Sequence, residues 1–396
     1  MSVSRTKPRW GRRLLFGLLG LLAFVAALIY VFGYLVFSAP VYAGKTSEHF
    51  NGEKFFTPEA ASRGDEFQSF LKWQRERQPE AWPERIATKF GAPPPKRVGM
   101  GELRITFINH ATTLIQTDSI NILTDPIWSE RCSPLAFAGP KRVRDAGIRF
   151  EDLPPIDAVV ISHNHYDHCD VPTLQRLEVV HHPKFFVGLG NKAFLESQGI
   201  SNSIERDWWQ AFDTLGTVKF TCVPTKHFSA RGLADRDKTL WCGFAIETSN
   251  GNIFFAGDTG YGSHFTEIGR RYGPLRLAIL PIGAYKPEWF MSPVHVSPKE
   301  AVKAHQDLRA ATSVAMHFGT FNLADEGPMT PVNDLEAALK QIEPRPQFWV
   351  LEFGEGRDVP QVSGETKYDE LQLPLGITMI TIDQLWQTLK RNYLKM

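Results

Sequence analysis

The densest group of chemically active side chains is the run His-Asn-His-Tyr-Asp-His-Cys-Asp at His163–Asp170. It offers three imidazoles and a carboxylate within six positions, directly after the apolar run Ala158–Ser162. Neutral imidazole and ionised carboxylate are the ligand types that bind zinc in catalytic sites. The HxHxDH spacing therefore predicts a metal-dependent hydrolase. We interpret Cys169 as a small buried side chain rather than as a ligand.

Three further candidate ligands each follow an apolar run later in the chain: His227, Asp258 and His317. A strand end is a rigid platform from which loop side chains can converge on one point. A single histidine after a strand is more often structural than a ligand. Three such positions together with HxHxDH favour ligands over structural residues. We expect all of them to meet in one site.

The bulk composition narrows the class of protein. With 396 residues, 43% hydrophobic and 22% charged, the chain is globular and forms one large domain or two of ordinary size. A net charge of +1, with no basic stripe outside the N-terminus, gives no reason to expect nucleic acid as a partner. The four cysteines have no CxxC spacing and are too few for a disulfide scaffold.

The N-terminus carries a candidate membrane segment. Residues Leu14–Phe37 are uncharged and rich in Leu, Phe and Val, and the run is long enough to cross a bilayer as a helix. Five basic residues precede it, so the positive-inside rule keeps the N-terminus cytoplasmic and sends the rest across the membrane. The run exceeds the ~7–15 apolar residues of a signal peptide. We therefore expect an uncleaved single-pass anchor and an extracytoplasmic catalytic domain, periplasmic if the source is bacterial.

The chain after this segment has the pattern of a layered α/β protein. We expect a basic tail over 1–13, a transmembrane helix over 14–37, a linker and helical region over 38–95, and a hydrolase domain over 96–396. Strands are expected at 104–107, 113–116, 121–123, 158–162, 184–187, 218–223, 253–256, 277–281 and 313–316, and helices at 172–177, 192–197, 298–307 and 333–341. Helical spacing also begins after Asp65, interrupted by Pro79 and Pro83. Strands covered by helices imply layers of both.

The ordered set of motifs resembles the metallo-β-lactamase superfamily. HNHYDH, His227, Asp258 in FFAGDTGYG and His317 in MHFGTF carry this resemblance. Longer stretches, including ITFINHATTLI, LTDPIW, RDWW and PIGAYKPEWFM, are similar to the phospholipases D that hydrolyse N-acylphosphatidylethanolamine. The resemblance covers about Arg104 to Gly354. It implies an αββα sandwich with a two-metal site at one edge.

The resemblance also implies a cofactor, two zinc ions per chain. One zinc would be held by His163, His165 and His227, and the other by Asp167, His168 and His317, with Asp258 bridging both. A hydroxide held between two cations is a nucleophile near neutral pH and would attack phosphorus in line. The catalytic residues implied are Asp167, Asp258 and His295. Zinc is favoured by the histidine-rich set, although iron and manganese occupy similar sites.

Several residues around this set have a weaker sequence signal. His295 in PVHVSPKEAV matches a family active-site histidine, and two roles stay open: contact with phosphate or proton transfer, and structural support of a ligand. We expect His110 in INHATT and Asp125 in LTDPIW to support ligand histidines from behind. Two positions depart from the family pattern, because Asn109 replaces the usual glycine and Val294 replaces a polar residue beside the active-site histidine.

Aromatic and remaining histidine residues complete the candidate set. A substrate-binding apolar lip for acyl chains is expected at Tyr285, Trp289, Phe290 and Met291, with core packing as the alternative. The remaining histidines have no strand-end context, and we interpret them as surface or capping residues: His49, His181, His182, His264 and His305.

The function that the resemblance implies is a membrane-anchored phosphodiesterase. It would hydrolyse N-acylphosphatidylethanolamine, or a related phospholipid, to N-acylethanolamine and phosphatidic acid. One alternative keeps the fold and changes the substrate to a lactone, an amide or a soluble phosphodiester. Another is a non-catalytic metal-binding or assembly factor at the membrane, against which the complete ligand set argues. Phospholipid and membrane are the expected partners, and the oligomeric state stays open, a homodimer included.

Overall fold

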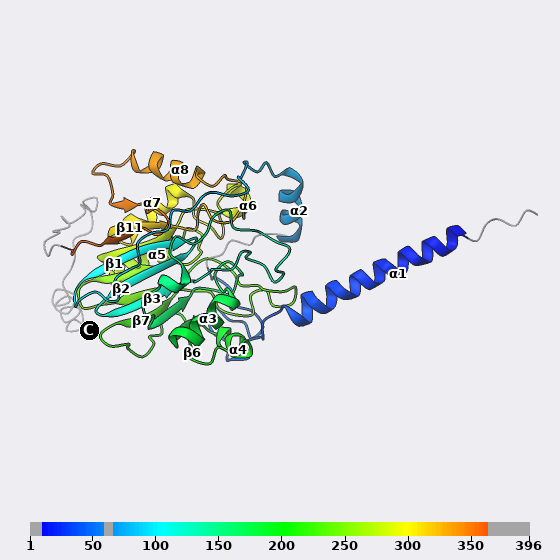
Figure 1. Cartoon of the computed structure of the whole chain (residues 1–396), viewed down its shortest axis with the longest axis horizontal. Helices are drawn as coiled ribbons and strands as arrows, with labels where there is room; N and C mark the ends of the chain where they lie inside the picture. Colours follow the sequence, from blue (N-terminus) through cyan, green and yellow to red (C-terminus); the bar gives the residue numbers. More distant parts are fainter. Residues whose placement is uncertain (1–9, 59–65, 363–396) are drawn as a thin grey trace, which may run out of the picture. The chain divides into compact units, whose positions relative to one another are not determined.

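Two β-sheets face each other in the computed structural model, which describes residues 10–58 and 66–362 (Figure 1). The first sheet has the order β13-β1-β2-β3-β4-β5-β6. Its strands are β1 (Leu103–Asn109), β2 (Thr112–Thr117), β3 (Ile120–Thr124), β4 (Ala158–Ile161), β5 (Lys184–Gly188), β6 (Ser203–Arg206) and β13 (Gly356–Asp358). The strands β1 to β3 form an antiparallel meander, whereas β3 to β6 are parallel.

The second sheet has the order β12-β11-β10-β9-β8-β7. Its strands are β7 (Lys219–Val223), β8 (Gly243–Glu247), β9 (Asn252–Phe255), β10 (Leu275–Pro281), β11 (Ala310–Met316) and β12 (Phe348–Trp349). The strands β9 to β12 are parallel, so β9, β10 and β11 all end at the same edge of the sheet. This edge is where the sequence places Asp258 and His317.

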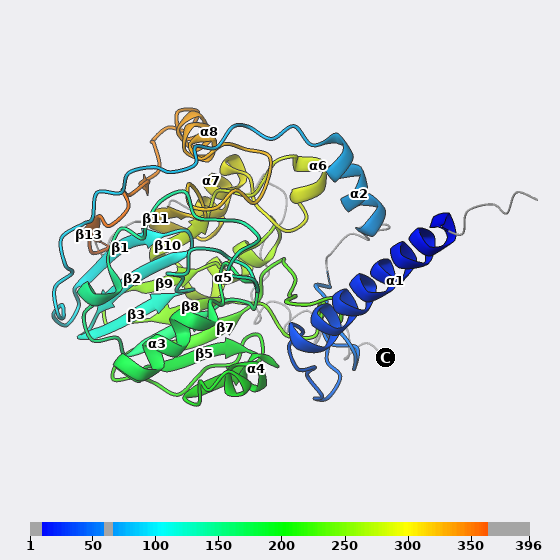
Figure 2. The same cartoon turned by 45° about the vertical axis from the view of Figure 1, so that its right-hand side comes forward.

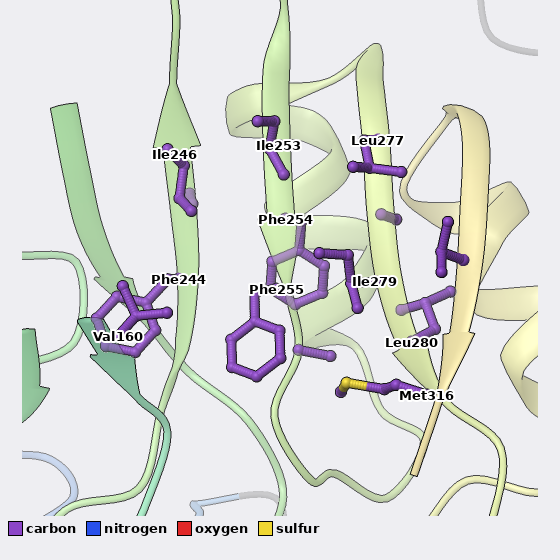
Figure 3. Close-up of a cluster of buried hydrophobic side chains, with 14 of the residues drawn as sticks. Val160, Phe244, Ile246, Ile253, Phe254, Phe255, Leu277, Ile279, Leu280 and Met316 are labelled. Carbon is purple, nitrogen blue, oxygen red and sulfur yellow. The ribbon is translucent and has the colours of Figure 1, made fainter. Parts of the chain in front are cut away.

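The main core lies between the two sheets (Figure 3). It includes Val160 of the first sheet together with Phe244, Phe254 and Phe255 of the second. Side chains of β4 alternate between two cores, because Val160 belongs to this one and Val159 to a second cluster under the helices. A strand that is buried on both faces has a continuous apolar sequence, which is what Ala158–Ile161 shows.

Helices cover the outer face of each sheet (Figure 2). The helices α3 (Val171–His181) and α4 (Asn191–Ser197) bury leucine and phenylalanine against the first sheet. The helices α5 (His264–Tyr272), α7 (Pro298–Asp307) and α8 (Thr330–Leu339) pack on the second. Ser297 and Glu300 form a capping box at α7, and Pro298 stands at its first turn, so the sequence sets its start. The expected αββα fold class is therefore confirmed.

The N-terminal region contributes two helices. An apolar helix, α1 (Trp10–Tyr30), continues as the π-helical turn η1 (Val31–Val36), and Arg13–Tyr34 is a candidate membrane span by length and composition. The helix α2 (Glu66–Glu76) follows later and matches the helical spacing expected after Asp65. Between these helices, Phe50 and Phe55 are buried in the main core. Part of the segment expected to be a linker is thus fixed to the sandwich.

Every strand and helix expected from the sequence is present, with ends shifted by a few residues. The sequence reading missed the strands β6, β8, β12 and β13 and the helix α5, together with the short helix α6 (Glu288–Met291) and the 3-10 turn η2 (Phe150–Asp152). These elements are short or lack a clear apolar period. Their positions depend on neighbours far away in the sequence, as in the pairing of β13 with β1.

Candidate metal centre

Loops at the ends of four strands bring the predicted ligands together. His163 lies two residues after the end of β4, and His317 follows β11 directly. Asp258 comes shortly after β9, and His227 comes shortly after β7. Each of these side chains is buried, at 5% exposure or less. The two sheets therefore each supply one part of a single site, as the strand-end argument predicts.

Three imidazoles form the first group: His163, His165 and His227. The His163 Nε2 and His165 Nδ1 atoms lie 2.8 Å apart, and the His227 Nε2 atom lies 3.3 Å from His165 Nδ1. Two imidazole nitrogens at such distances repel unless a proton or a cation lies between their lone pairs. A tetrahedral zinc with Zn–N distances of ~2.0–2.1 Å sets its ligand nitrogens about 3.3 Å apart. The group has the composition and spacing of a metal site.

A second group contains a carboxylate as well as imidazoles: His110, Asp167, His168 and His317. The Asp167 Oδ2 atom lies 3.3 Å from His168 Nε2 and 3.4 Å from His317 Nε2. It also lies 2.9 Å from His110 Nε2. The sequence predicted that His110 supports a ligand histidine from behind. In the structure its ring instead contacts the carboxylate of an expected ligand, Asp167, directly.

Asp258 lies between these two groups. Its Oδ2 atom is 3.2 Å from both His168 Nε2 and His317 Nε2, and 3.8 Å from His227 Nε2. The same oxygen is 3.8 Å from His295 Nδ1. This is the place that a bridging carboxylate requires. We call the seven predicted ligands the ligand cluster: His163, His165, Asp167, His168, His227, Asp258 and His317.

Further hydrogen bonds hold the ligand cluster from behind. The Asp125 Oδ2 atom lies 2.7 Å from His168 Nδ1, and it accepts a hydrogen bond from Ser162 Oγ at 2.5 Å. Ser162 Oγ is also 2.9 Å from His163 Nδ1. One buried carboxylate therefore orients a histidine of each group, directly for His168 and through a hydroxyl for His163. The sequence predicted the support by Asp125, but it gave no signal for Ser162.

Gly257 makes the close approach between two of these loops possible. Its φ of +59° lies in the left-handed region, and a Cβ atom there would lie 2.4 Å from the Ser162 Cβ. Any larger residue would push Ser162 away from Asp125 and His163. The glycine before Asp258 is thus required by contact between the two halves of the site.

The Arg231 side chain holds the His163–Asp170 run from its other side. The Arg231 guanidinium donates hydrogen bonds to the backbone oxygens of Asn164 at 2.8 Å and Cys169 at 2.9 Å. It also lies over the Tyr166 ring, 3.9 Å from the ring centroid. Both ends of the turn between the histidines are therefore fixed by one side chain.

The electrostatics of the ligand cluster match the protonation states that a metal requires. Burial lowers the pKa of His165 to about 3, and it lowers the pKa of His163 and of His227, so these imidazoles are neutral. Burial by itself raises the pKa of Asp258, but the nearby histidines His317 and His168 hold that pKa well below its usual value. Neutral imidazole and ionised carboxylate are the forms that bind cations.

Two histidines in the ligand cluster show the opposite shift. Burial lowers the pKa of His317, yet Asp258 and Asp167 raise it to about 9. The same two carboxylates raise the pKa of His168 well above its usual value against the effect of burial. The buried carboxylate of Asp258 and the partly buried one of Asp167 thus demand positive charge, which comes either from protons on these histidines or from metal ions in their place.

Unpartnered buried atoms give an independent test of the fit to a metal. Among the described residues, four polar atoms at the centre of the site are buried without a hydrogen-bond partner: His168 Nε2, His317 Nε2, His295 Nδ1 and Asp258 Oδ1. Leaving such atoms unsatisfied costs about 1–3 kcal/mol each, and more for charged groups. Divalent metal ions bound by the ligand cluster would satisfy the atoms of His168, His317 and Asp258, and His295 would stay free to contact a substrate.

The ligand cluster opens into a cavity of about 720 Å³. His295 and Arg236 line it beside the cluster, and its remaining surface is largely apolar. Two short helices supply most of that surface, and we call their side chains the aromatic walls: Phe67, Phe70 and Trp73 of α2, and Trp289, Phe290 and Met291 of α6. The rings of Trp73 and Phe290 stack 5.1 Å apart, so the two helices meet there.

The structure corrects two expectations. Tyr285 is not part of the lip, because its side chain is buried and its hydroxyl donates a hydrogen bond to Asp334 on α8. His264 and His305 are not surface residues: they are 9% and 7% exposed, and their rings hydrogen-bond to Thr259 and Ser313 respectively. Partners in neighbouring elements satisfy these polar groups, and the sequence alone did not show them.

Two layers of strands with buried histidines and aspartates at one edge define a metal-dependent hydrolase. The β-lactamase superfamily domain matches residues 120–318, about half of the chain. The chain belongs to this superfamily. Among solved structures, the isothiocyanate hydrolase from Delia radicum gut bacteria aligns over 64% of this chain and 98% of its own, with a TM-score of 0.51 and 20% identity. At that identity the likeness concerns the fold alone.

Two relatives are more similar in sequence. The N-acyl-phosphatidylethanolamine-hydrolyzing phospholipase D 1 of Caenorhabditis elegans is 40% identical over 226 residues, which are 54% of this chain and 64% of that protein. The mitochondrial N-acyl-phosphatidylethanolamine-hydrolyzing phospholipase D of Saccharomyces cerevisiae is 34% identical over 238 residues, which are 58% of this chain and 50% of that protein. The matched regions thus span less than two thirds of these relatives.

Proposed function

We propose that the protein is a membrane-anchored phosphodiesterase that hydrolyses N-acylphosphatidylethanolamine, or a related phospholipid, to N-acylethanolamine and phosphatidic acid. The observation that carries this proposal is one cavity with the ligand cluster at its base and the aromatic walls around it. Such a cavity suits a substrate with a phosphodiester and long acyl chains. The similarity to the nematode and yeast enzymes supports the same substrate class.

The residues present fit two zinc ions per chain. His163, His165 and His227 would hold one ion, Asp167, His168 and His317 the other, and Asp258 would contact both. Bound there, the ions would supply a water activated for attack near neutral pH and stabilise negative charge on phosphate oxygens. In the overall reaction, the water oxygen joins phosphorus, the bond from phosphorus to the N-acylethanolamine oxygen breaks, and that oxygen takes up a proton.

The chain's own side chains have separate tasks in this reaction. Asp167 and Asp258 stay ionised and place their charge between the histidines. His295 lies partly buried at the cavity surface, and desolvation lowers its pKa to about 4, so it would meet the phosphodiester as a neutral imidazole. Arg236 lines the same part of the cavity and supplies positive charge toward the phosphate. These positions are proposals for contact with the headgroup.

The aromatic walls would take the acyl chains. Trp289, Phe290 and Met291 belong to the lip expected from the sequence, and α2 adds Phe67, Phe70 and Trp73. Burying alkyl chains against such side chains gains roughly 0.8 kcal/mol per methylene group. The cavity would therefore bind long-chain substrates much more tightly than short soluble ones.

The N-terminal helix would hold this cavity at a bilayer. Arg13–Tyr34 has the length and hydropathy of a membrane span. With basic residues ahead of it, we propose a cytoplasmic N-terminus and an extracytoplasmic catalytic domain over 96–396. A reporter enzyme that is active only outside the cytoplasm, fused after the catalytic domain, tests this orientation. An inactive reporter on an expressed, membrane-bound fusion would contradict it.

A substrate panel tests the proposed function. The purified full-length protein with zinc is incubated with N-acylphosphatidylethanolamine, phosphatidylcholine, an acyl lactone, a fatty amide and bis(p-nitrophenyl) phosphate. We expect N-acylethanolamine and phosphatidic acid from the first substrate, and heavy oxygen from labelled water in the phosphatidic acid. Turnover of the lactone, the amide or the soluble diester alone would overturn the proposal. Metal analysis of the same preparation should give about two zinc ions per chain, and one or none would refute the two-metal assignment.

A further inference from the structure

One loop connects the ligand cluster to both aromatic walls. It covers residues 318–329, and it begins directly after His317, which belongs to the ligand cluster. Near its end stand two adjacent buried carboxylates, Asp325 and Glu326, which are 7% and 5% exposed. Neither carboxylate lines the cavity. Their hydrogen-bond partners show which parts of the structure they hold in place.

Asp325 binds the end of α2. Its Oδ1 atom accepts hydrogen bonds from the Trp73 indole nitrogen and from Arg77 Nε, both at 3.2 Å. Its Oδ2 atom accepts one from the backbone nitrogen of Gln78 at 3.3 Å, and its backbone oxygen accepts one from Glu80 at 2.8 Å. A single residue thus receives four donors from the segment that includes α2 and the turns after it.

Glu326 binds the start of α6 in the same way. Its carboxylate accepts hydrogen bonds from the backbone nitrogens of Ala284 and Lys286, the latter at 3.1 Å. Asp325 adds a bond from its own backbone nitrogen to the Lys286 oxygen at 3.1 Å. The two neighbouring carboxylates therefore fix the two helices that carry the aromatic walls.

The helix α2 is anchored mainly through one side chain, Trp73, whose indole donates to Asp325. It is an eleven-residue helix, and isolated helices below ~12–15 residues are marginal in water. Among its described side chains, Trp73 is buried, whereas Phe67 and Leu71 are 69% and 50% exposed. The buried Trp73 side chain stacks on Phe290, packs against Ala284, Met291 and Ala324, and donates a hydrogen bond to Asp325. Removing the Asp325 carboxylate would therefore loosen the helix at this anchor.

We propose that Asp325 is a specificity-determining residue: it positions α2 as one wall of the acyl-chain compartment and so sets the enzyme's preference for long chains. The inference rests on the proposed function for the nature of the substrate. Asp325 itself touches neither the ligand cluster nor the cavity. It acts through Trp73 and Arg77, and its loss leaves the ligand cluster in place while the apolar compartment loses its α2 side.

Chain-length dependence of binding tests this role. Full-length protein in one glycosidic detergent is titrated with butylphosphocholine and with dodecylphosphocholine, and tryptophan fluorescence reports binding. Partitioning of the ligands into detergent micelles cancels in the comparison between variants, because every variant is measured at the same detergent concentration. We expect the wild type to bind the long chain much more tightly. Asp325→Asn should weaken binding of the long chain about tenfold relative to the short chain, since a charged acceptor of buried donors is lost.

Two further variants separate positioning from general stability. Trp73→Phe keeps the ring on Phe290 but removes the indole donor, and we expect the same loss of chain-length preference with a smaller size. Asp118→Asn is a matched control, because Asp118 is also buried, accepts bonds from Gly101 and Ser249, and lies outside the cavity. It should lower the thermal midpoint without changing the ratio of long-chain to short-chain binding.

Steady-state kinetics test the same role by separating an effect on KM from an effect on kcat. With Asp325→Asn, KM for the long-chain substrate should rise while its kcat and the metal content stay close to the wild type. Equal loss for butyl and dodecyl ligands, an unchanged ratio in a folded Asp325→Asn protein, or a wild type without chain-length preference would each overturn the inference. A wild type that shows the preference but does not release N-acylethanolamine would refute the proposed function and leave the inference supported.

Discussion

The ligand cluster and the aromatic walls line the same cavity but are built in opposite ways. Cluster side chains come from strand-end loops of both sheets, and His163, His168 and His227 are each held by a further buried group. Wall side chains come from two short helices, and Phe67 and Trp289 remain 69% and 48% exposed. The contrast indicates that the reaction is fixed by the sandwich, whereas the choice of substrate is set by elements that can change independently.

The supports of the two regions differ in number as well as in burial. Around the cluster, Asp125, Ser162 and Arg231 each make two or more contacts to the His163–Asp170 run or to its neighbours. The α2 wall is anchored through one small apolar cluster around Trp73 and through one carboxylate, Asp325. A single change in the walls should therefore alter specificity, while a single change in the cluster should alter the chemistry for every substrate.

Breaking the cluster at its centre should have the largest effect. Asp258→Asn keeps the size of the side chain but removes the charge between the two groups of ligands. We expect turnover of both a short soluble phosphodiester and N-acylphosphatidylethanolamine to fall about 10³-fold, since a preorganised charge at the reacting centre is lost. Turnover assays, metal analysis and circular dichroism of the purified variant measure this. A folded variant with full metal content and near-normal turnover would remove Asp258 from the centre of the site.

Weakening the support behind the cluster should have the next largest effect. Asp125→Asn leaves His168 and Ser162 without their charged acceptor, and we expect metal affinity to fall about 10–100-fold. Ser162→Ala removes only the link to His163 and should have a smaller effect, with Ser162→Thr restoring part of it. Competition with a chelator measures the affinity of each variant. Wild-type affinity in a folded Asp125→Asn protein would contradict the shared support of both groups.

The cluster was largely predictable from the sequence, for a physical reason. Four of its members stand in one short run, and the other three each follow an apolar strand, so the rule that ligands gather at strand ends was sufficient. The same reasoning gave the strands that carry them. The sequence could not show Ser162 as a relay or Gly257 as a contact point, because both roles depend on how two loops meet in space.

The walls were predicted only in part. The segment from Tyr285 to Met291 was expected to contribute an apolar lip. Trp289, Phe290 and Met291 of α6 do line the cavity, but Tyr285 does not. Its hydroxyl donates to a partly exposed carboxylate, Asp334, 49 residues away. The sequence predicted α2 as a helix but did not predict where it packs, since nothing within its own sequence points to the site. Its hydrogen bonds to Asp325, which lies far along the chain, help to fix it beside the cavity.

Changing the α6 wall should affect long-chain substrates selectively. Phe290→Ala removes the ring that stacks on Trp73 and lines the cavity. We expect kcat/KM for a long-chain phospholipid to fall about tenfold more than kcat/KM for a short soluble diester, because lost apolar contact with about two methylene groups accounts for that factor. Parallel assays with the two substrates give the ratio. Equal losses for both substrates would mean that the wall supports the reacting centre rather than the chain.

The exposed edge of the α2 wall should show the smallest effect. Phe67 lines the cavity while 69% exposed, so an alkyl chain gains little additional burial against it. We expect Phe67→Ala to lower kcat/KM for the long-chain substrate about two- to threefold, with little change in the thermal midpoint. Phe137→Ala is the matched control, because Phe137 is 80% exposed and lies outside the cavity. If both variants lose long-chain activity equally, exposed aromatic surface in general, rather than the α2 wall, favours the lipid. A loss confined to Phe67→Ala, and smaller than that of Phe290→Ala, would show that the walls contribute in proportion to the contact each offers to the chain.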